Sequence, residues 1–215
     1  MPANLLSGNY QKKCIKGSKF LSSLDQDWNS LVSSVGPCKL NLSIELEPYQ
    51  ALIKSVIFQQ LRPASATAIF NRFKQNFDNN FPTEEKILAS PESKLKESGL
   101  SFNKGKTIIE IARHVQKGEL ENRQDFLMMN DSQIIEKLTK IKGIGEWTAQ
   151  MLMIFNLGKL DVFPVSDFAL RKNYSLFKSI ASPITMKELS KISEEWKPFR
   201  SIAAWYLWRY ANILN

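Results

Sequence analysis

Apolar residues recur at intervals of three and four along almost the whole chain, and no other feature constrains the fold as strongly. This spacing places apolar side chains along one face of an α-helix. Glycine and proline interrupt it, as at Gly36-Pro37 and Gly118, and so divide the chain into separate helices. Strand patterns are scarce, because the short segment 161–165 contains Pro164 and is predicted to be an extended loop. The sequence therefore predicts an all-α fold.

Several predicted helices start at residues that commonly cap or open a helix. Pro48 is predicted at the first position of one helix, and Ser90 is predicted to cap another. Either Asp131 or Ser132 is expected to cap a third helix. The N-terminal part is predicted to contain a single helix that stops at Gly36-Pro37, preceded by a basic run interpreted as a solvated tail. That run consists of Lys12, Lys13, Lys16 and Lys19.

Composition excludes several kinds of chemistry. The chain has 29 Lys and Arg against 21 Asp and Glu, and its net charge of +8 suits a polyanionic partner. Charge alone leaves a nucleic acid partner and its absence about equally open. Only two cysteines, Cys14 and Cys38, and one histidine, His114, are present. These counts exclude a Cys/His zinc site, a cysteine-ligated iron–sulfur cluster and a multi-histidine metal site, and they disfavour a Ser–His–Asp hydrolase.

The sequence contains no sign of a membrane or secretory segment. No apolar run approaches the roughly 18 residues that a membrane-spanning helix needs, and the N-terminus lacks the apolar core of a secretory signal. Two cysteines without a disulfide framework fit a reducing compartment. We therefore expect a soluble intracellular protein.

The segment Lys142-Gly143-Ile144-Gly145 joins two predicted helices. Its glycines permit a tight turn and the close approach of another backbone, while Ile144 is expected to enter the core. The second helix then presents free N–H groups and the positive end of its dipole, a geometry that favours phosphate binding. An ordinary corner between two helices accounts for about half of such patterns. The turn alone therefore does not decide the function.

Asp167 follows this turn by about twenty residues, after the loop that contains Pro164. Ser166 is predicted to cap a new helix, which places Asp167 in its first turn. There the helix dipole favours the ionised carboxylate. By itself this pattern is more often an ordinary acid at a helix N-terminus than a functional carboxylate.

Three stretches together resemble a known family. IKGIGEWTAQMLMIF (141–155), continued by DVFPVSDFALRK (161–172), looks like the hairpin and aspartate region of the helix-hairpin-helix DNA glycosylase superfamily. IFQQLRPASATAIFNRF (57–73) and PFRSIAAWYLWRY (198–210) resemble its DNA-intercalating loop and its C-terminal helix. The nearest branch is that of 3-methyladenine DNA glycosylase II and the yeast-type methyladenine glycosylases.

The resemblance implies two interlocked helical subdomains with a DNA cleft between them. Subdomain A would comprise about residues 1–47 and 165–215, and subdomain B about residues 48–164, including the hairpin at 142–145. The chain is too short for the N-terminal β-domain of the larger bacterial members.

The resemblance also implies roles for individual residues. Asp167 would be the catalytic carboxylate that stabilises positive charge on the deoxyribose, and Leu61 would fill the gap left by a flipped base. The implied base pocket is formed by Trp147, Met151 and Phe58. The implied DNA contacts, besides Leu61, are Gln60, Arg62, Lys142, Gly143, Ile144, Gly145 and Thr148. Backbone carbonyls of Thr139, Ile141 and Ile144 would hold a structural Na⁺ or K⁺ ion, and no other cofactor is required.

Three positions depart from the usual family pattern. Ser166 stands where many members carry a second acid, Met151 where some carry tyrosine, and Arg62 where a smaller polar residue or histidine is common. Trp147 occupies the place of the Schiff-base lysine of bifunctional relatives, so no lyase activity is expected. Lys142, nearby in the hairpin, is the alternative residue that could form a Schiff base with the sugar in place of that lysine.

These features predict a monofunctional DNA N-glycosylase that removes alkylated purines, such as 3-methyladenine and 7-methylguanine, from double-stranded DNA. The first alternative is a weak or inactive homologue that binds abasic or damaged DNA, for which Ser166 and Arg62 are the motivation. The second is a helix bundle unrelated to DNA. The protein is expected to be a monomer in a bacterial cytoplasm or a eukaryotic nucleus, without membrane contact.

Overall fold

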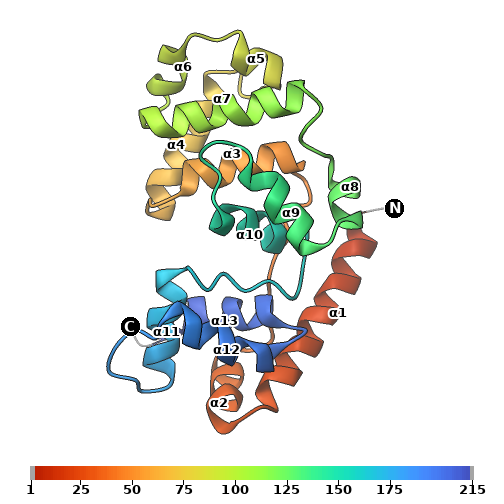
Figure 1. The fold of residues 1–215 in the computed structure, drawn as a ribbon, viewed down its shortest axis with the longest axis vertical. Coiled ribbons are helices and arrows are strands. Elements are labelled where there is room, and N and C mark those ends of the chain that lie inside the picture. The colour runs from red at the N-terminus through yellow and green to blue at the C-terminus, as the bar shows by residue number, and fades with distance from the viewer. Residues whose placement is uncertain (1–2, 214–215) are drawn as a thin grey trace. The chain divides into compact units, whose positions relative to one another are not determined.

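The computed structural model describes residues 3–213 and shows α-helices, one short 3₁₀ helix and no strands within that range (Figure 1). The predicted all-α fold is confirmed. No described helix is both long and apolar enough to cross a membrane. The helices are α1 Ala3–Ser22, α2 Gln26–Val35, α3 Pro48–Phe58, α4 Pro63–Gln75, α5 Glu84–Leu88, α6 Glu92–Glu97, α7 Phe102–Gln116, α8 Arg123–Met128, α9 Asp131–Thr139, α10 Glu146–Phe155, α11 Phe168–Phe177, α12 Met186–Ser193, η1 Glu194–Trp196 and α13 Arg200–Ile213.

Contacts between helices divide the chain into two compact units. Unit 1 comprises Met1–Leu42 and Met153–Asn215, and unit 2 comprises Ser43–Leu152. The sequence placed the second boundary near residue 164, whereas the structure places it inside α10. The reason is that the last turn of α10 packs within unit 1, where the rings of Phe155 and Trp208 stack with their centroids 5.7 Å apart. Residues 1–2 and 214–215 of the predicted subdomain A lie outside the described residues.

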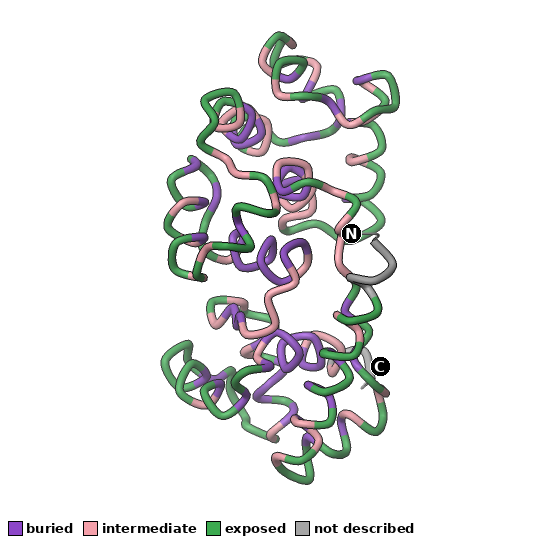
Figure 2. Tube along the Cα trace, turned by 90° about the vertical axis from the view of Figure 1, so that its right-hand side faces the viewer, coloured by how far each residue is buried: buried purple, intermediate pink, exposed green. Residues whose placement is uncertain are grey.

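The core of unit 1 is built on aromatic side chains from α2, η1 and α11. The Trp28 ring lies 5.4 Å from Trp196 and 5.0 Å from Phe177, measured between centroids. Such tilted and edge-on contacts add to the stabilisation that burial of these large rings provides. Buried residues line the inner faces of the helices in each unit, with exposed residues outside (Figure 2). Trp28 and Trp196 are each 2% exposed, so unit 1 has a densely packed centre.

The N-terminal part of unit 1 contains two helices, so the prediction of a single helix was wrong. The chain breaks between Ser22 and Gln26 because the Asp25 side chain accepts a hydrogen bond from the backbone N–H of Trp28 and caps α2. The basic run therefore lies on α1 rather than in a tail. Ser18 ties α1 to the segment after α2: its Oγ donates to the Cys14 carbonyl at 3.0 Å and accepts from the Cys38 N–H at 2.9 Å. Both cysteine side chains are free thiols with no exposed surface.

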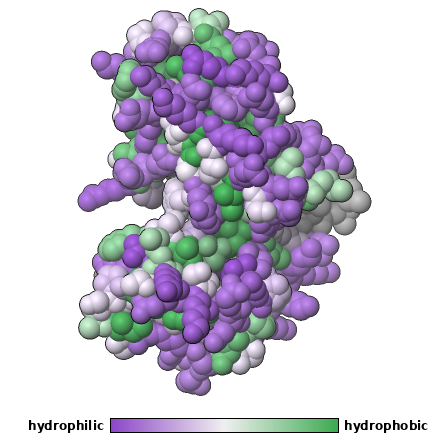
Figure 3. Space-filling model, viewed as in Figure 1, coloured by the Kyte–Doolittle hydropathy of each residue, from purple (hydrophilic) through white to green (hydrophobic). Residues whose placement is uncertain are grey.

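Unit 2 is organised around α7, which contacts α3, α5 and α6. Ile108 and Ile111 of α7 are completely buried. In the same unit, Phe73 and Phe81 meet edge to face at 5.9 Å between ring centroids. Outside this core the face shown in Figure 3 is covered mainly by hydrophilic residues. The buried apolar residues of α7 thus form part of the core of unit 2.

Capping explains where several helices start. Pro48 opens α3 as predicted. The cap of α9 is Asn130, not Asp131 or Ser132: Asn130 Oδ1 accepts from the Gln133 N–H at 2.9 Å, and the Gln133 side chain accepts from the Asn130 N–H at 3.0 Å. This reciprocal pair satisfies two backbone donors, which neither predicted residue does. Ser90 does not cap α6 either, because Pro91 occupies the capping position without a side-chain hydrogen bond.

Candidate active site

The turn between α9 and α10 has the predicted hairpin form. Gly143 has a φ of +94°, a conformation that favours glycine. A Cβ atom at this position would lie 2.0 Å from Oγ1 of Thr107, so the turn packs directly on α7. Ile144 is 4% exposed and enters the core as predicted, while Lys142 points to the exposed surface.

Gly145 differs from Gly143 in its surroundings. A Cβ atom at Gly145 would have no neighbouring heavy atom within 4 Å, apart from its own chain neighbours. The carbonyl of Gly145 accepts the N–H of Ala149 at 3.1 Å, so this residue leads straight into α10. Internal packing therefore requires a glycine at position 143 but leaves open space at position 145, at the N-terminus of α10.

The carbonyl groups predicted to hold a cation lie in the same turn. Thr139 ends α9, and the Ile141 carbonyl accepts the N–H of Ile144 at 3.0 Å. A carbonyl oxygen has a second lone pair, which this bond leaves available. No group of three or more Asp, Glu, His and Cys side chains that could hold a metal occurs among the described residues. Any cation at the turn would therefore be held by backbone oxygens.

The Leu61 loop, residues 59–62, connects α3 to α4. Leu61 is 38% exposed, Arg62 is exposed, and Gln60 has a φ of +53°, which is uncommon for a residue with a side chain. Gln59 Nε2 donates to Oγ1 of Thr148 in α10 at 2.9 Å. The loop thus presents an apolar side chain on a backbone that is fixed from within unit 2.

Lys104 of α7 supplies a second set of contacts to this loop. Its Nζ donates to the carbonyls of Ile57 at 2.9 Å and Gln59 at 2.8 Å, at the C-terminal end of α3. Partial burial of the ammonium group lowers the pKa of Lys104 from its ordinary value. This residue was not among the predicted site residues.

The remaining predicted residues of unit 2 differ in exposure. Trp147 is half-buried, and Met151 is buried with 8% of its surface exposed. Phe58 is half-buried and meets Phe70 edge to face at 6.2 Å between centroids. Thr148 is buried and its hydroxyl accepts the bond from Gln59, so its side chain supports the Leu61 loop instead of facing the surface.

In unit 1, Asp167 caps α11, so the prediction that Ser166 caps this helix was wrong. Asp167 Oδ1 accepts the backbone N–H of Leu170 at 3.0 Å, and Ser166 is exposed outside the helix. Asp167 Oδ2 accepts a long hydrogen bond of 3.4 Å from the indole Nε1 of Trp208. Both oxygens of a half-buried carboxylate are therefore oriented, one by the helix N-terminus and one by α13.

Sequence reasoning did not identify Trp208 as a site residue. It lies in the apolar pattern of α13, which predicts a core side chain, and it does stack on Phe155. Its contact with Asp167 spans 41 residues of sequence. The only available signal was the indole N–H itself, since a partly buried tryptophan usually needs an acceptor.

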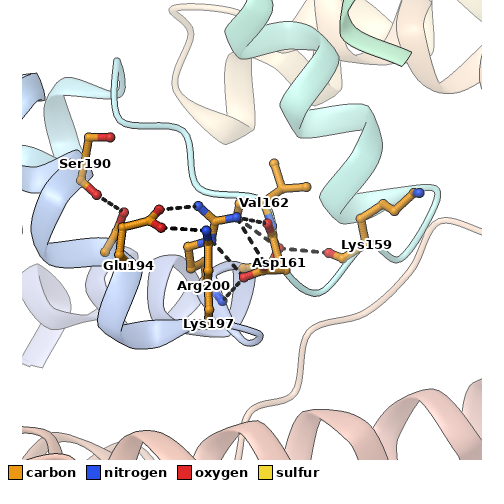
Figure 4. A network of polar contacts seen from close by, with 9 residues as sticks. Lys159, Asp161, Val162, Ser190, Glu194, Lys197 and Arg200 are labelled. Atoms are coloured by element: carbon orange, nitrogen blue, oxygen red, sulfur yellow. Dashed lines mark hydrogen bonds and ion pairs between the residues drawn. The ribbon is translucent and has the colours of Figure 1, made fainter. Parts of the chain in front are cut away.

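The loop that leads to Asp167 is held by a polar network at the start of α13 (Figure 4). Arg200 Nε donates to Asp161 Oδ1 at 2.8 Å, and Arg200 Nη2 donates to Asp161 Oδ2 at 3.0 Å. Arg200 Nη1 also donates to Glu194 at 3.2 Å. Next to this pair, Ser201 Oγ accepts the Val162 N–H at 2.9 Å and donates to nearby loop carbonyls. The two-pronged Arg200–Asp161 contact fixes the first residues of the loop.

Replacing Arg200 with lysine is expected to lower the free energy of unfolding by about 1–2 kcal/mol, because one ammonium group cannot match both carboxylate oxygens. For a chain of this size that corresponds to a fall in melting temperature of about 2–8 °C. Calorimetry measures the change. Arg113→Lys is the matched control, since Arg113 pairs with Glu110 on the surface of the same helix and is expected to have little effect. An equal fall in both variants would contradict the role given to the Arg200–Asp161 pair.

Comparisons with known proteins agree with this geometry. Residues 53–199 match the family described as HhH-GPD superfamily base excision DNA repair protein. An alkylbase DNA glycosidase-like protein of Schizosaccharomyces pombe is 36% identical over 200 residues, 92% of this chain and 94% of that protein. DNA-3-methyladenine glycosylase 1 of the same organism is 38% identical over 202 residues, 93% of this chain and 89% of that protein.

Solved structures lead to the same group of proteins. The 3-methyladenine DNA glycosylase of Schizosaccharomyces pombe, in complex with abasic DNA, aligns with a TM-score of 0.85 at 39% identity, covering 90% of this chain and 95% of that one. A DNA-3-methyladenine glycosidase from Bacillus halodurans aligns with a TM-score of 0.79 at 30% identity, covering 92% and 90%.

Proposed function

The chain belongs to the HhH-GPD superfamily of base excision DNA repair proteins, and we propose that it hydrolyses the N-glycosidic bond of alkylated purines in double-stranded DNA. The observation that carries the proposal is the orientation of the Asp167 carboxylate by Leu170 and Trp208. The names of the similar proteins supply 3-methyladenine as the expected substrate, and we include 7-methylguanine as a second alkylated purine. Such an enzyme acts where DNA is kept, in a nucleus or a bacterial cytoplasm, and needs no partner copy.

The proposed reaction begins with removal of the damaged base from the duplex. A base inside the stack is out of reach, so the nucleotide has to rotate out of the helix. Leu61 is exposed and apolar, on a loop whose backbone is fixed, and these are the properties of a side chain that fills the gap. The free space at Gly145 and the N-terminal N–H groups of α10 suit a backbone phosphate. Exposed Gln60, Arg62 and Lys142 add polar and positive contacts.

Asp167 then stabilises the transition state. Alkylation gives 3-methyladenine or 7-methylguanine a positive charge, so the base leaves readily and charge builds on the deoxyribose. A carboxylate held in place before the reaction stabilises that charge without the cost of reorientation. The hydrogen bonds from Leu170 and Trp208 hold the carboxylate in this way. Asp167 also supplies an acceptor for the attacking water.

The base pocket is proposed to contain Trp147, Met151 and Phe58. A half-buried tryptophan offers a face on which an electron-poor, alkylated base can stack. Met151 contributes an adaptable apolar wall. Because Ser166 stands where many members carry a second acid, the start of α11 carries less negative charge beside Asp167 than two acids would give it.

The hairpin carbonyls fit a monovalent cation. Carbonyl oxygens are ligands for hard ions, and the carbonyls of Thr139, Ile141 and Ile144 come from one short turn. A Na⁺ or K⁺ ion there would hold the turn in shape and add positive charge near a bound phosphate. The chain's own groups carry out the bond cleavage.

The enzyme is expected to hydrolyse the N-glycosidic bond and release the base without cutting the DNA strand. Trp147 stands where a lyase would have its lysine, and Lys142 is an exposed side chain of the hairpin turn. Incubation with abasic duplex and borohydride is therefore expected to trap no protein–DNA adduct on a denaturing gel. A trapped band that disappears in Lys142→Gln would overturn this assignment.

Base release from methylated genomic DNA tests the proposed function. Chromatography of the freed bases is expected to show 3-methyladenine, 7-methylguanine or both, above the level without protein. One alternative is a homologue that binds damaged DNA without cleaving the bond, which Ser166 and Arg62 motivate. That alternative predicts tight binding to abasic duplex and no released base from any alkylated substrate.

A further inference from the structure

We propose that Lys104 is the positioning residue of the Leu61 loop, and that its ammonium group holds the loop ready for insertion into DNA before DNA binds. The proposal rests on the proposed function, in which Leu61 fills the gap left by the flipped base. Lys104 itself lies on α7, more than forty residues along the chain from this loop, and bonds to it only through backbone carbonyls.

The contacts of Lys104 resemble those of a helix C-terminal cap. The carbonyls at the end of α3 have no partner within the helix and carry its negative dipole end. Lys104 Nζ donates to two of them, those of Ile57 and Gln59, at 2.9 and 2.8 Å. A charged donor gives stronger hydrogen bonds than a neutral one. No ion pair of Lys104 with an acid is found among the described residues, so its charge acts on the backbone of α3 and the loop.

The backbone after this cap is held in an uncommon conformation. Gln60 has a φ of +53°, which a residue with a side chain adopts only when its surroundings enforce it. Gln59, the residue before Gln60, makes two hydrogen bonds. Its carbonyl accepts from Lys104, and its side chain donates to Thr148. On its C-terminal side, Pro63 opens α4. Leu61 therefore lies in a short segment between the hydrogen-bonded Gln59 and the start of α4 at Pro63.

This arrangement matters for base flipping because a mobile wedge would have to become ordered at the moment of insertion. Ordering a flexible segment opposes binding, and a segment already fixed avoids that cost. Removing the Lys104 ammonium leaves two carbonyls without their donor and frees Gln60 to relax. Removal of the ammonium should therefore slow the base-flipping step, since Lys104 itself touches neither base nor sugar in this role.

Hydrogen exchange of the free protein tests the anchoring without any substrate. In Lys104→Met, amides of residues 57–62 are expected to exchange at least about tenfold faster than in the wild type, because the variant keeps the apolar stem and loses the charged donor. Lys104→Arg, which can still donate to both carbonyls, is expected to restore most of the protection. Lys117→Met at the other end of α7 is the matched control and should leave these amides unchanged. Unchanged exchange in Lys104→Met would overturn the proposal.

Kinetics then separate positioning from general damage to the fold. Single-turnover release of 7-methylguanine is measured from a fully paired duplex and from a bulge in which the same base is already unstacked. Lys104→Met is expected to slow release about tenfold in the paired duplex and less than about twofold in the bulge, where flipping costs less. Equal slowing of both substrates would overturn the positioning role. If the wild type releases no base, the proposed function fails, and the exchange measurement still decides whether Lys104 anchors the loop.

Discussion

Replacing Asp167 with asparagine is expected to slow base release at least about 100-fold, because the group that stabilises the positive charge of the transition state loses its own charge. The fold is expected to survive, since asparagine caps a helix as well as aspartate does. Its side-chain oxygen can still accept the Leu170 N–H that Asp167 binds at 3.0 Å. The rate is measured in single turnover on a duplex with one 7-methylguanine, and the melting temperature is measured beside it.

The control removes a carboxylate near the N-terminus of a different helix. Glu92 lies in the first turn of α6 and is exposed, so Glu92→Gln should leave the rate of base release unchanged. Affinity for abasic duplex should stay within about threefold of the wild type in both variants, because the phosphate contacts are intact. A rate for Asp167→Asn near that of the wild type, in a folded protein that binds DNA, would show that another group stabilises the charge.

Replacing Gly143 with alanine is expected to have the largest effect on stability. The new Cβ would lie 2.0 Å from Thr107 Oγ1 and 3.0 Å from Thr107 Cβ, so rotation of the threonine cannot relieve the clash. The φ of +94° adds backbone strain for any residue with a side chain. Together these effects should lower the free energy of unfolding by about 2–3 kcal/mol, measured by urea denaturation.

Gly145→Ala is the matched comparison within the same turn. Its Cβ would meet open space, so stability should change by less than about 0.5 kcal/mol. Affinity for abasic duplex should nevertheless fall, because the methyl group stands where a phosphate is proposed to approach. Thr107→Ala should recover part of the stability lost in Gly143→Ala, as a double-mutant cycle will measure. Equal stability losses in the two glycine variants would contradict the packing described for the hairpin.

Much of the fold could be predicted because its helices carry strong local signals. The all-helical fold and the hairpin between α9 and α10 followed from apolar spacing and from glycine placement. The N-cap residues were harder to predict, because neighbouring residues can each cap the same helix. Ser166 and Asp167 are both good caps, and local sequence does not reveal that Trp208, on a helix distant in sequence, donates to the second carboxylate oxygen of Asp167.

The functional residues that sequence reasoning missed act through contacts with residues distant in the sequence. Lys104 looks like any surface lysine in sequence, and only the fold brings its ammonium to the end of α3. The resemblance placed Thr148 among the DNA contacts, whereas in the structure Thr148 is buried and its hydroxyl accepts a hydrogen bond from Gln59. The periodicity of apolar residues shows which face of a helix is buried, but it does not show which polar atoms form hydrogen bonds with one another.

The complete burial of Cys14 and Cys38 makes the chain suitable for site-specific labelling. They are its only cysteines, and neither side chain reaches solvent. Thiol reagents act on accessible thiolates, so the natural protein should react slowly. A single cysteine introduced at exposed Lys117 would then be the main site of modification, without removal of any native thiol. A fluorophore attached there would report the movement of the protein along DNA, with the rest of the chain unaltered.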